Sequence, residues 1–213
     1  MTALFIITAI LGIIPFLFLF EKRNELQKET LYLTPLIFLS FFSSLYEVVF
    51  TYCLKFPSAY WFRLYLLLEF LALFYLFLKI FNSRRITILL YVFLLVYLAY
   101  FIFLLFHWRL EDGLKTDSYL STFSTVFLYV FCLLWFRRVF LYFEVDNLFS
   151  SPIFIALCGQ LLYFSSTLFL FLMSDYFFKD GKHHFLAFWQ LNVIMCIVYR
   201  IFLWAALYKG VKK

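Results

Sequence analysis

Long apolar stretches alternate with short polar segments along the whole chain. Each stretch is close to the ~20 residues that an α-helix needs to cross a bilayer, and none alternates polar with apolar positions as a membrane β-barrel does. The pattern predicts an all-α polytopic membrane protein with a single seven-helix domain, its spans lying at 3–20, 31–54, 61–81, 86–106, 119–136, 152–173 and 185–207. The amphiphilic segment 139–149 is expected to lie along the membrane interface.

The composition supports this class and excludes others. The chain has 213 residues, of which 66% are hydrophobic, and it holds 34 Phe and 16 Tyr. Soluble domains are only about 45–50% apolar. The net charge is +6, but the basic residues are scattered between spans and do not gather on one face, which argues against nucleic-acid binding. The bilayer is therefore the first partner. Four cysteines form no CxxC motif, and we expect no disulfide.

The orientation follows from lysine and arginine in the short segments between spans. Eleven follow the first, third, fifth and seventh spans, and six lie on the other side. Basic loops stay on the cytoplasmic side. We therefore expect an inner-membrane protein with its N-terminus outside and its C-terminus in the cytoplasm. No basic residue precedes the first span, which we expect to be an uncleaved helix.

Two glutamates, Glu47 and Glu69, lie inside apolar runs of the second and third spans. A carboxylate in a membrane helix costs about 2.5–3.5 kcal/mol on insertion scales. With the orientation above, both lie roughly 10–12 Å below the outer edge of their helices. Two carboxyls at equal depth on adjacent helices can share a proton or a cation. The alternative is a structural role for each carboxyl, paired with a tyrosine or an arginine.

Other polar residues repeat at helical spacing on the second, fifth, sixth and seventh spans. We expect these faces to turn inward and form an outward-opening ligand or proton pocket, made of the two glutamates with Ser43, Thr51, Ser166, Trp189 and Asn192. A deeper polar cluster is expected at Gln160, Tyr163, Tyr199 and Arg200. Serine and threonine stripes also serve simply as hydrogen-bonding contacts between helices. Arg200 has two open roles, as a structural counter-charge or in ligand binding and gating.

Catalytic and cofactor motifs are absent from the sequence. It contains no HExxH, no GxSxG and no phosphate-binding glycine loop, and it has only 5 Gly. The seventh span has no central lysine for a retinal Schiff base. His183 and His184 are adjacent, and we expect them to lie in an interfacial loop and not to bind metal. We therefore expect no cofactor, no metal and no enzymatic activity.

A short internal similarity relates the second and sixth spans. Thr34-Pro35-Leu36-Ile37-Phe38 is similar to Ser151-Pro152-Ile153-Phe154-Ile155, and a tyrosine follows each proline after eleven residues. Two parallel three-helix repeats joined by the fourth span would produce this similarity. Such an arrangement resembles the sugar-transporter-like PQ-loop folds, although their proline-glutamine motif is missing. Parallel repeats occur in several transporters.

A second resemblance covers most of the chain. Its motifs are Tyr46-Glu47-Val48-Val49, Leu68-Glu69-Phe70, Ser151-Pro152-Ile153-Phe154-Ile155 with Gly159 and Leu161-Leu162-Tyr163-Phe164, and Leu191-Asn192 before a basic tail. These resemble a family of small seven-helix inner-membrane proteins of Bacteroidetes-type bacteria, which are similar to membrane sensory modules linked to sensor histidine kinases. The resemblance implies a signalling role and no chemistry.

Three functions therefore stay open at this point. The first is a receptor-like module that binds a small ligand near Glu47 and Glu69 and signals to a cytoplasmic partner. The second is a small-solute transporter, coupled to protons through the glutamates. The third is a membrane-embedded enzyme acting on a lipid, with a carboxyl as acid or base.

Overall fold

The computed structural model describes residues 2–55, 58–107, 113–142, 147–180 and 182–212. Most of these residues belong to seven α-helices: α1 (Thr2–Lys22), α2 (Thr34–Tyr46), α3 (Ser58–Ile80), α4 (Arg84–Phe106), α5 (Gly113–Tyr142), α6 (Pro152–Asp180) and α7 (Lys182–Lys209). Three shorter helical segments complete the described structure: η1 (Thr30–Leu33), η2 (Glu47–Cys53) and η3 (Leu148–Ser150). The all-helical class expected from the sequence is confirmed.

Six helical segments in the described part of the chain are long and apolar enough to cross a membrane. They are Thr30–Phe50, Tyr60–Ile80, Arg84–Phe106, Asp117–Tyr142, Pro152–Leu170 and Gln190–Lys209. The chain is therefore a multi-pass membrane protein. Helix α1 is also apolar, and its 21 residues exceed the length that a span requires.

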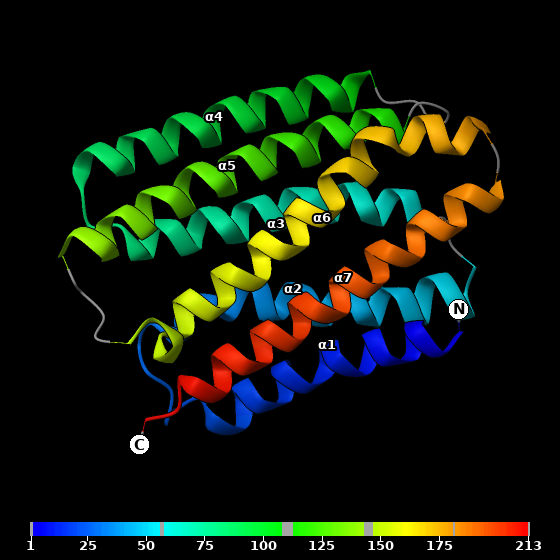
Figure 1. The fold of residues 1–213 in the computed structure, drawn as a ribbon. Helices are drawn as coiled ribbons and strands as arrows, with labels where there is room; N and C mark the ends of the chain where they lie inside the picture. The colour runs from blue at the N-terminus through cyan, green and yellow to red at the C-terminus, as the bar shows by residue number, and fades with distance from the viewer. Residues whose placement is uncertain (1, 56–57, 108–112, 143–146, 181, 213) are drawn as a thin grey trace.

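Six of the helices form a closed ring, and the seventh lies outside it. Helix α1 packs against α2 and α7, α3 against α2 and α5, and α6 against α5 and α7. Helix α4 lies at the edge of the bundle, against α3 and α5 (Figure 1). The two chain ends lie at opposite ends of the bundle (Figure 1). Most of the surface of α4 is exposed, as expected for a helix that faces lipid.

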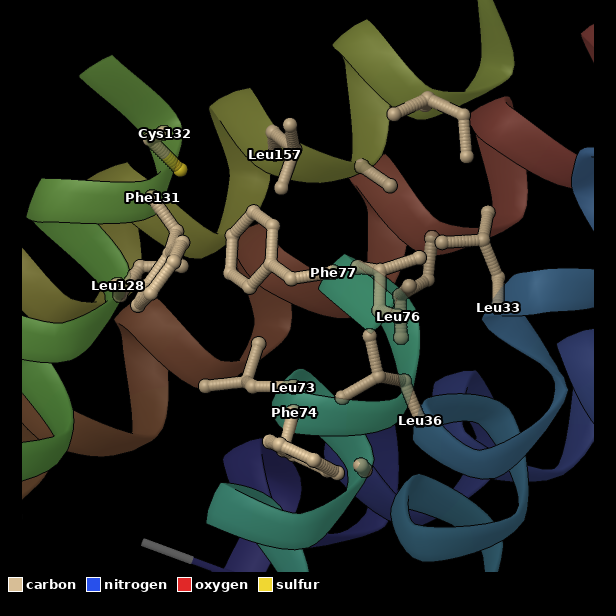
Figure 2. Close-up of a cluster of buried hydrophobic side chains, with 14 of the residues drawn as sticks. Leu33, Leu36, Leu73, Phe74, Leu76, Phe77, Leu128, Phe131, Cys132 and Leu157 are labelled. Carbon is tan, nitrogen blue, oxygen red and sulfur yellow. The ribbon is translucent and has the colours of Figure 1, made fainter. Parts of the chain in front are cut away.

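The core lies around α3, and aromatic rings fill much of it. Phe77 of α3 points toward Leu157 of α6 and Phe131 of α5, and Leu76 points toward Leu36 of α2 (Figure 2). The ring centroids of Phe77 and Phe131 lie 5.5 Å apart. Contacts of this kind are favourable for aromatic pairs at separations of about 4.5–7 Å. Side chains of α3 therefore fill much of the space between α2, α5 and α6.

The expected second span, 31–54, is not one regular α-helix. It begins with the 3₁₀ turn η1, continues as α2 from Thr34–Pro35, and ends in the π-helix η2. The wider hydrogen bonding is visible where the amide of Leu54 donates to the carbonyl of Val49, five residues earlier, at 3.1 Å. The proline sits in the first turn of α2, where its missing N–H costs nothing.

Helix α5 is longer than the expected span 119–136, because it runs from Gly113 to Tyr142. The expectation of a separate interfacial segment at 139–149 is therefore wrong at its start. Val139 is buried in the core, and Nη1 of Arg138 donates to the backbone carbonyl of Ile80 at the end of α3, at 3.1 Å. Arg137 and Arg138 therefore lie inside α5 and not in a loop after it. The bond from Arg138 satisfies a carbonyl at the C-terminal end of α3 that has no partner within its own helix.

Candidate functional site

Glu69 occupies the middle of α3 and is almost completely buried, with 3% of its surface exposed. The hydroxyl of Tyr65, one helical turn earlier, donates a hydrogen bond to Oε1 of Glu69 at 3.0 Å. The carboxyl is also within electrostatic range of Tyr163 on α6 and of Cys196 and Tyr199 on α7. A carboxyl predicted from sequence to face the interior does face it, surrounded by phenols and a thiol.

Arg200 of α7 is the buried cation of this interior, with 3% of its surface exposed. Its Nη1 donates to the backbone carbonyl of Thr8 on α1. Gly12, one turn further along α1, leaves room for the guanidinium, because a Cβ atom there would lie 3.1 Å from Nη1 of Arg200.

Glu47, the first residue of η2, lies within electrostatic range of Arg200. Its side chain is half-buried, and Arg200 is the charged group with which it interacts electrostatically. Cys196, one turn before Arg200, lies within electrostatic range of both Glu47 and Glu69. The two glutamates thus turn toward one interior, but each has a different partner in the structure. A proton shared between them stays a prediction.

Gln160 and Tyr199 connect α6 to α7 beside the glutamates. Nε2 of Gln160 donates to the Tyr199 hydroxyl at 2.7 Å, and the ring centroids of Tyr163 and Tyr199 lie 5.7 Å apart. The other amide atom of Gln160, Oε1, is buried and has no hydrogen-bond partner, and the same holds for Oδ1 of Asn192 and Oγ of Ser40. The residues expected to form a separate deeper cluster therefore join the glutamates in one polar interior.

The remaining members of the expected pocket do not join this cluster. The hydroxyl of Ser166 donates to the carbonyl of Leu162 in its own helix at 2.7 Å. Ser43 is half-buried, and its backbone carbonyl accepts a bond from the amide of Glu47. The side chains of Thr51 and Trp189 lie outside the described residues.

The hydroxyl stripe of α5 shows the same behaviour as Ser166. Thr122, Ser124 and Thr125 donate to carbonyls four residues earlier in α5, at 2.8–3.1 Å. These hydroxyls are satisfied within their own helix. The stripe therefore fits a packing role better than a ligand-binding role.

A second buried ionic contact lies between α3 and α5, and sequence reasoning missed it. Nη1 of Arg63 and Oδ1 of Asp117 are 3.8 Å apart, and both side chains are almost completely buried. The guanidinium also lies over the ring of Phe101 on α4, 5.8 Å from its centroid. From the sequence, Arg63 had been counted among the loop charges outside. The sequence signal for this pair was one arginine and one aspartate, Arg63 and Asp117, near the starts of the third and fifth expected spans.

Tyr65 is the second group that the sequence analysis missed. It lies four residues before Glu69, a spacing that places both side chains on one face of α3. In a helix with tyrosines and phenylalanines at many positions, this spacing does not stand out. Burial of the carboxyl is what makes the hydroxyl of Tyr65 its hydrogen-bond donor.

The described residues offer no metal centre, because no group of three or more His, Cys, Asp or Glu side chains among them could hold an ion. The expectation of a loop at His183 and His184 is wrong, because both residues belong to the first turn of α7. Their side chains lie outside this description. Comparison of the chain with protein-family models, with curated proteins and with solved structures gave no match. Any inference about function therefore depends on the buried polar residues themselves.

Proposed function

We propose that the protein is a receptor- or sensor-like module of a bacterial inner membrane, which changes conformation when its buried polar interior gains or loses a proton or a small ligand. In this proposal it has seven spans, α1 included, with the N-terminus outside and the C-terminus in the cytoplasm. A cytoplasmic partner reads the change, since the loops at that end are too short for an output domain of their own.

The observation that carries the proposal is the burial of Glu69 and Arg200 inside the bundle. Each has 3% of its surface exposed, and each is held by a partner on the described chain. Ionisable residues inside membrane proteins are costly and tend to mark functional sites. Together with Glu47, these residues belong to three different elements, α3, α7 and η2. A change of charge there acts on several helices at once.

A route from this interior to the cytoplasmic end is provided by α7. Beyond Arg200 the helix ends at Lys209, and the tail pairs with the loop between α1 and η1. The amide of Gln27 donates to the carbonyl of Gly210, and the amide of Lys212 donates to the carbonyl of Glu25, both at 2.8 Å. A shift of α7 would therefore move this loop.

The proposed orientation agrees with the count of lysine and arginine residues between the spans, after Arg63 is removed from that count. Arg63 is buried against Asp117 and does not belong to the outer loops. Its removal from the outer count increases the excess of basic residues on the proposed cytoplasmic side. This agrees with the tendency of lysine and arginine to stay in the cytoplasm.

Spin-label distances test the sensor proposal. Labels at positions 23 and 137, both on exposed arginines, report on the proposed cytoplasmic end in a background in which exposed Cys53 is replaced by serine. The protein in nanodiscs is brought from about pH 8 to about pH 4, a range over which carboxyl groups titrate. We expect the distance distribution to shift in this protein and to stay fixed in the matched Arg200→Gln variant. A distribution that does not change in either protein would contradict the sensor proposal.

The helix arrangement also favours a second candidate, a small-solute transporter. The ring consists of two similar halves, α1–α3 and α5–α7, with α4 outside as the linker. The contact of α1 with α2 corresponds to that of α5 with α6, and the contact of α2 with α3 corresponds to that of α6 with α7. The similar sequences at Thr34–Pro35 and Ser151–Pro152 start α2 and α6, which correspond in the two halves. Solute flux into proteoliposomes, driven by a pH gradient, would support this candidate over the sensor.

A further inference from the structure

Once the half-buried Glu47 is counted with the buried charges, the described part of the bundle holds more carboxyl groups than cations. Four charged side chains are buried among those that the structure describes: Arg63, Glu69, Asp117 and Arg200. Arg63 and Asp117 form one pair, 3.8 Å apart. Arg200 donates to the backbone carbonyl of Thr8 and lies within electrostatic range of the half-buried Glu47. Glu69 is the one left over.

No described lysine, arginine or histidine contacts Glu69. Its hydrogen-bond donor is the hydroxyl of Tyr65, a neutral group. A single ionised carboxylate, buried and without a cation, is far more costly than its neutral acid. We therefore propose that Glu69 is the proton-binding site of the protein, while Glu47 is the standing counter-ion of Arg200. The assignment of the proton to Glu69 does not depend on the proposed function. Only the use of that proton as a signal does.

The groups around Glu69 are consistent with a neutral acid that exchanges its proton. The titratable groups that face it are Tyr65 on α3, Tyr97 on α4, Tyr163 on α6, and Cys196 and Tyr199 on α7. None of these side chains is a cation. On α5, the described Asp117 faces Arg63 and Tyr97. On η2, the carboxyl of Glu47 faces Arg200 and Cys196.

Water is needed to carry the proton away, and two buried acceptors on α6 and α7 could hold it by hydrogen bonds. Oε1 of Gln160 and Oδ1 of Asn192 are buried acceptors without a hydrogen-bond partner. Buried acceptors of this kind are ordinarily satisfied by internal water. On release, the O–H bond of the Glu69 carboxyl breaks, and the proton passes to water. The resulting carboxylate keeps the hydrogen bond from Tyr65.

The proton has consequences for the contacts of α3. A neutral Glu69 both donates and accepts hydrogen bonds, whereas the carboxylate only accepts them. With the proton bound, Glu69 adds a donor to an interior that has unpaired acceptors. Without the proton, Glu69 adds a negative charge close to Cys196 and Tyr199. These two residues lie within one turn of Arg200 on α7. The two states therefore favour different positions of α7 relative to α3.

Infrared spectroscopy of the full chain in nanodiscs tests this assignment, because a protonated carboxyl has a C=O absorption distinct from that of a carboxylate, and the band shifts in D₂O. We expect a band of this kind at neutral pH in the parent protein. It should disappear in Glu69→Gln and persist in the matched variant Glu47→Gln. Circular dichroism and gel filtration report whether each variant is folded. Should Glu69→Gln fail to fold, Tyr65→Phe keeps the carboxyl and should shift the band without removing it.

Three results would overturn the assignment: no band at neutral pH, a band that persists in Glu69→Gln, or a band that disappears in Glu47→Gln alone. A band that appears only after sodium is removed would mean that Glu69 binds a metal cation and not a proton. A band that behaves as expected, without any spin-label shift, would retain the proton site and reject the sensor proposal. The two proposals therefore fail separately.

Discussion

The hydroxyl of Tyr65 lies 3.0 Å from Oε1 of Glu69, and the carboxyl of Glu69 is almost completely buried in the bundle. The bond joins two residues one turn apart on α3, a spacing that places both side chains on one face of the helix. The carboxyl, by contrast, is buried by α6 and α7, which supply the tyrosines around it. The spacing on α3 brings Tyr65 and Glu69 together, and the packing of the bundle removes the carboxyl from solvent.

Loss of this donor should weaken the protein slightly. We expect Tyr65→Phe to lower the free energy of unfolding by about 1 kcal/mol, the usual net worth of a hydrogen bond between neutral groups. Thermal unfolding in detergent measures the change. Tyr208→Phe serves as the control, because Tyr208 is exposed and its loss of a hydroxyl should have no measurable effect. A loss of about 3 kcal/mol or more would show that Glu69 is ionised, since bonds to charged groups are stronger.

Gly12 permits the close approach of α1 to α2 and α7. A Cβ atom at this position would lie 1.9 Å from Oγ of Ser44 and 3.1 Å from Nη1 of Arg200. We expect Gly12→Ala to destabilise the protein by about 1–3 kcal/mol, as overpacking does in other cores. Ser44→Ala added to it should recover part of the loss, since the nearest clashing atom is then gone. Equal stability of Gly12→Ala and the parent would mean that α1 packs less closely than the structure shows.

Helix α4 should tolerate change at all but a few positions. Leu95 and Ile102 are exposed, and Leu95→Ile or Ile102→Leu should alter the unfolding free energy by less than about 0.5 kcal/mol. Tyr97 is different, because its ring stacks on Phe70 at 3.8 Å and its hydroxyl donates to the carbonyl of Leu66 at 3.1 Å. We expect Tyr97→Leu to cost about 3 kcal/mol or more, by loss of packing and of the bond. Similar losses at all three positions would place α4 inside the bundle.

Topology is open to a direct test with reporters active only in the cytoplasm. A reporter fused after Lys213 should be active, and one inserted after Glu111 should be inactive. Insertion nearer to Ser118 is unsuitable, because α5 begins at Gly113. The opposite pattern of activity would reverse the orientation, and with it the positions of Glu47 and Glu69 relative to the outer surface.

Sequence patterns predicted the helices well, because length and apolarity decide whether a segment spans a membrane. They did not predict all of the residues that meet. Arg200 was expected near Tyr163, and it does lie within electrostatic range of that residue. Its hydrogen bond to the carbonyl of Thr8 on α1 was not expected. Side-chain length and direction, not depth, decided this contact.

Tyr97 illustrates a second limit of the sequence. Helix α4 is apolar on all sides and has three tyrosines, so no periodic pattern marks the face that packs on α3. Burial of Tyr97 and exposure of Tyr91 follow from the positions of α3 and α5. The buried pair of Arg63 and Asp117 was missed for a related reason, because charges near the end of a span look like loop charges until the helices are placed.

The unfolding free energies of five variants test the charge assignment most directly: Arg200→Gln, Glu47→Gln, Glu69→Gln, and Arg200→Gln combined with each glutamate change. Arg200→Gln should cost about 1–3 kcal/mol, since it leaves the half-buried Glu47 without the cation near it. If Glu47 is the partner of Arg200 and Glu69 carries a proton, Glu47→Gln should restore most of this loss, and Glu69→Gln should restore none of it. Restoration by Glu69→Gln, with none from Glu47→Gln, would contradict the account.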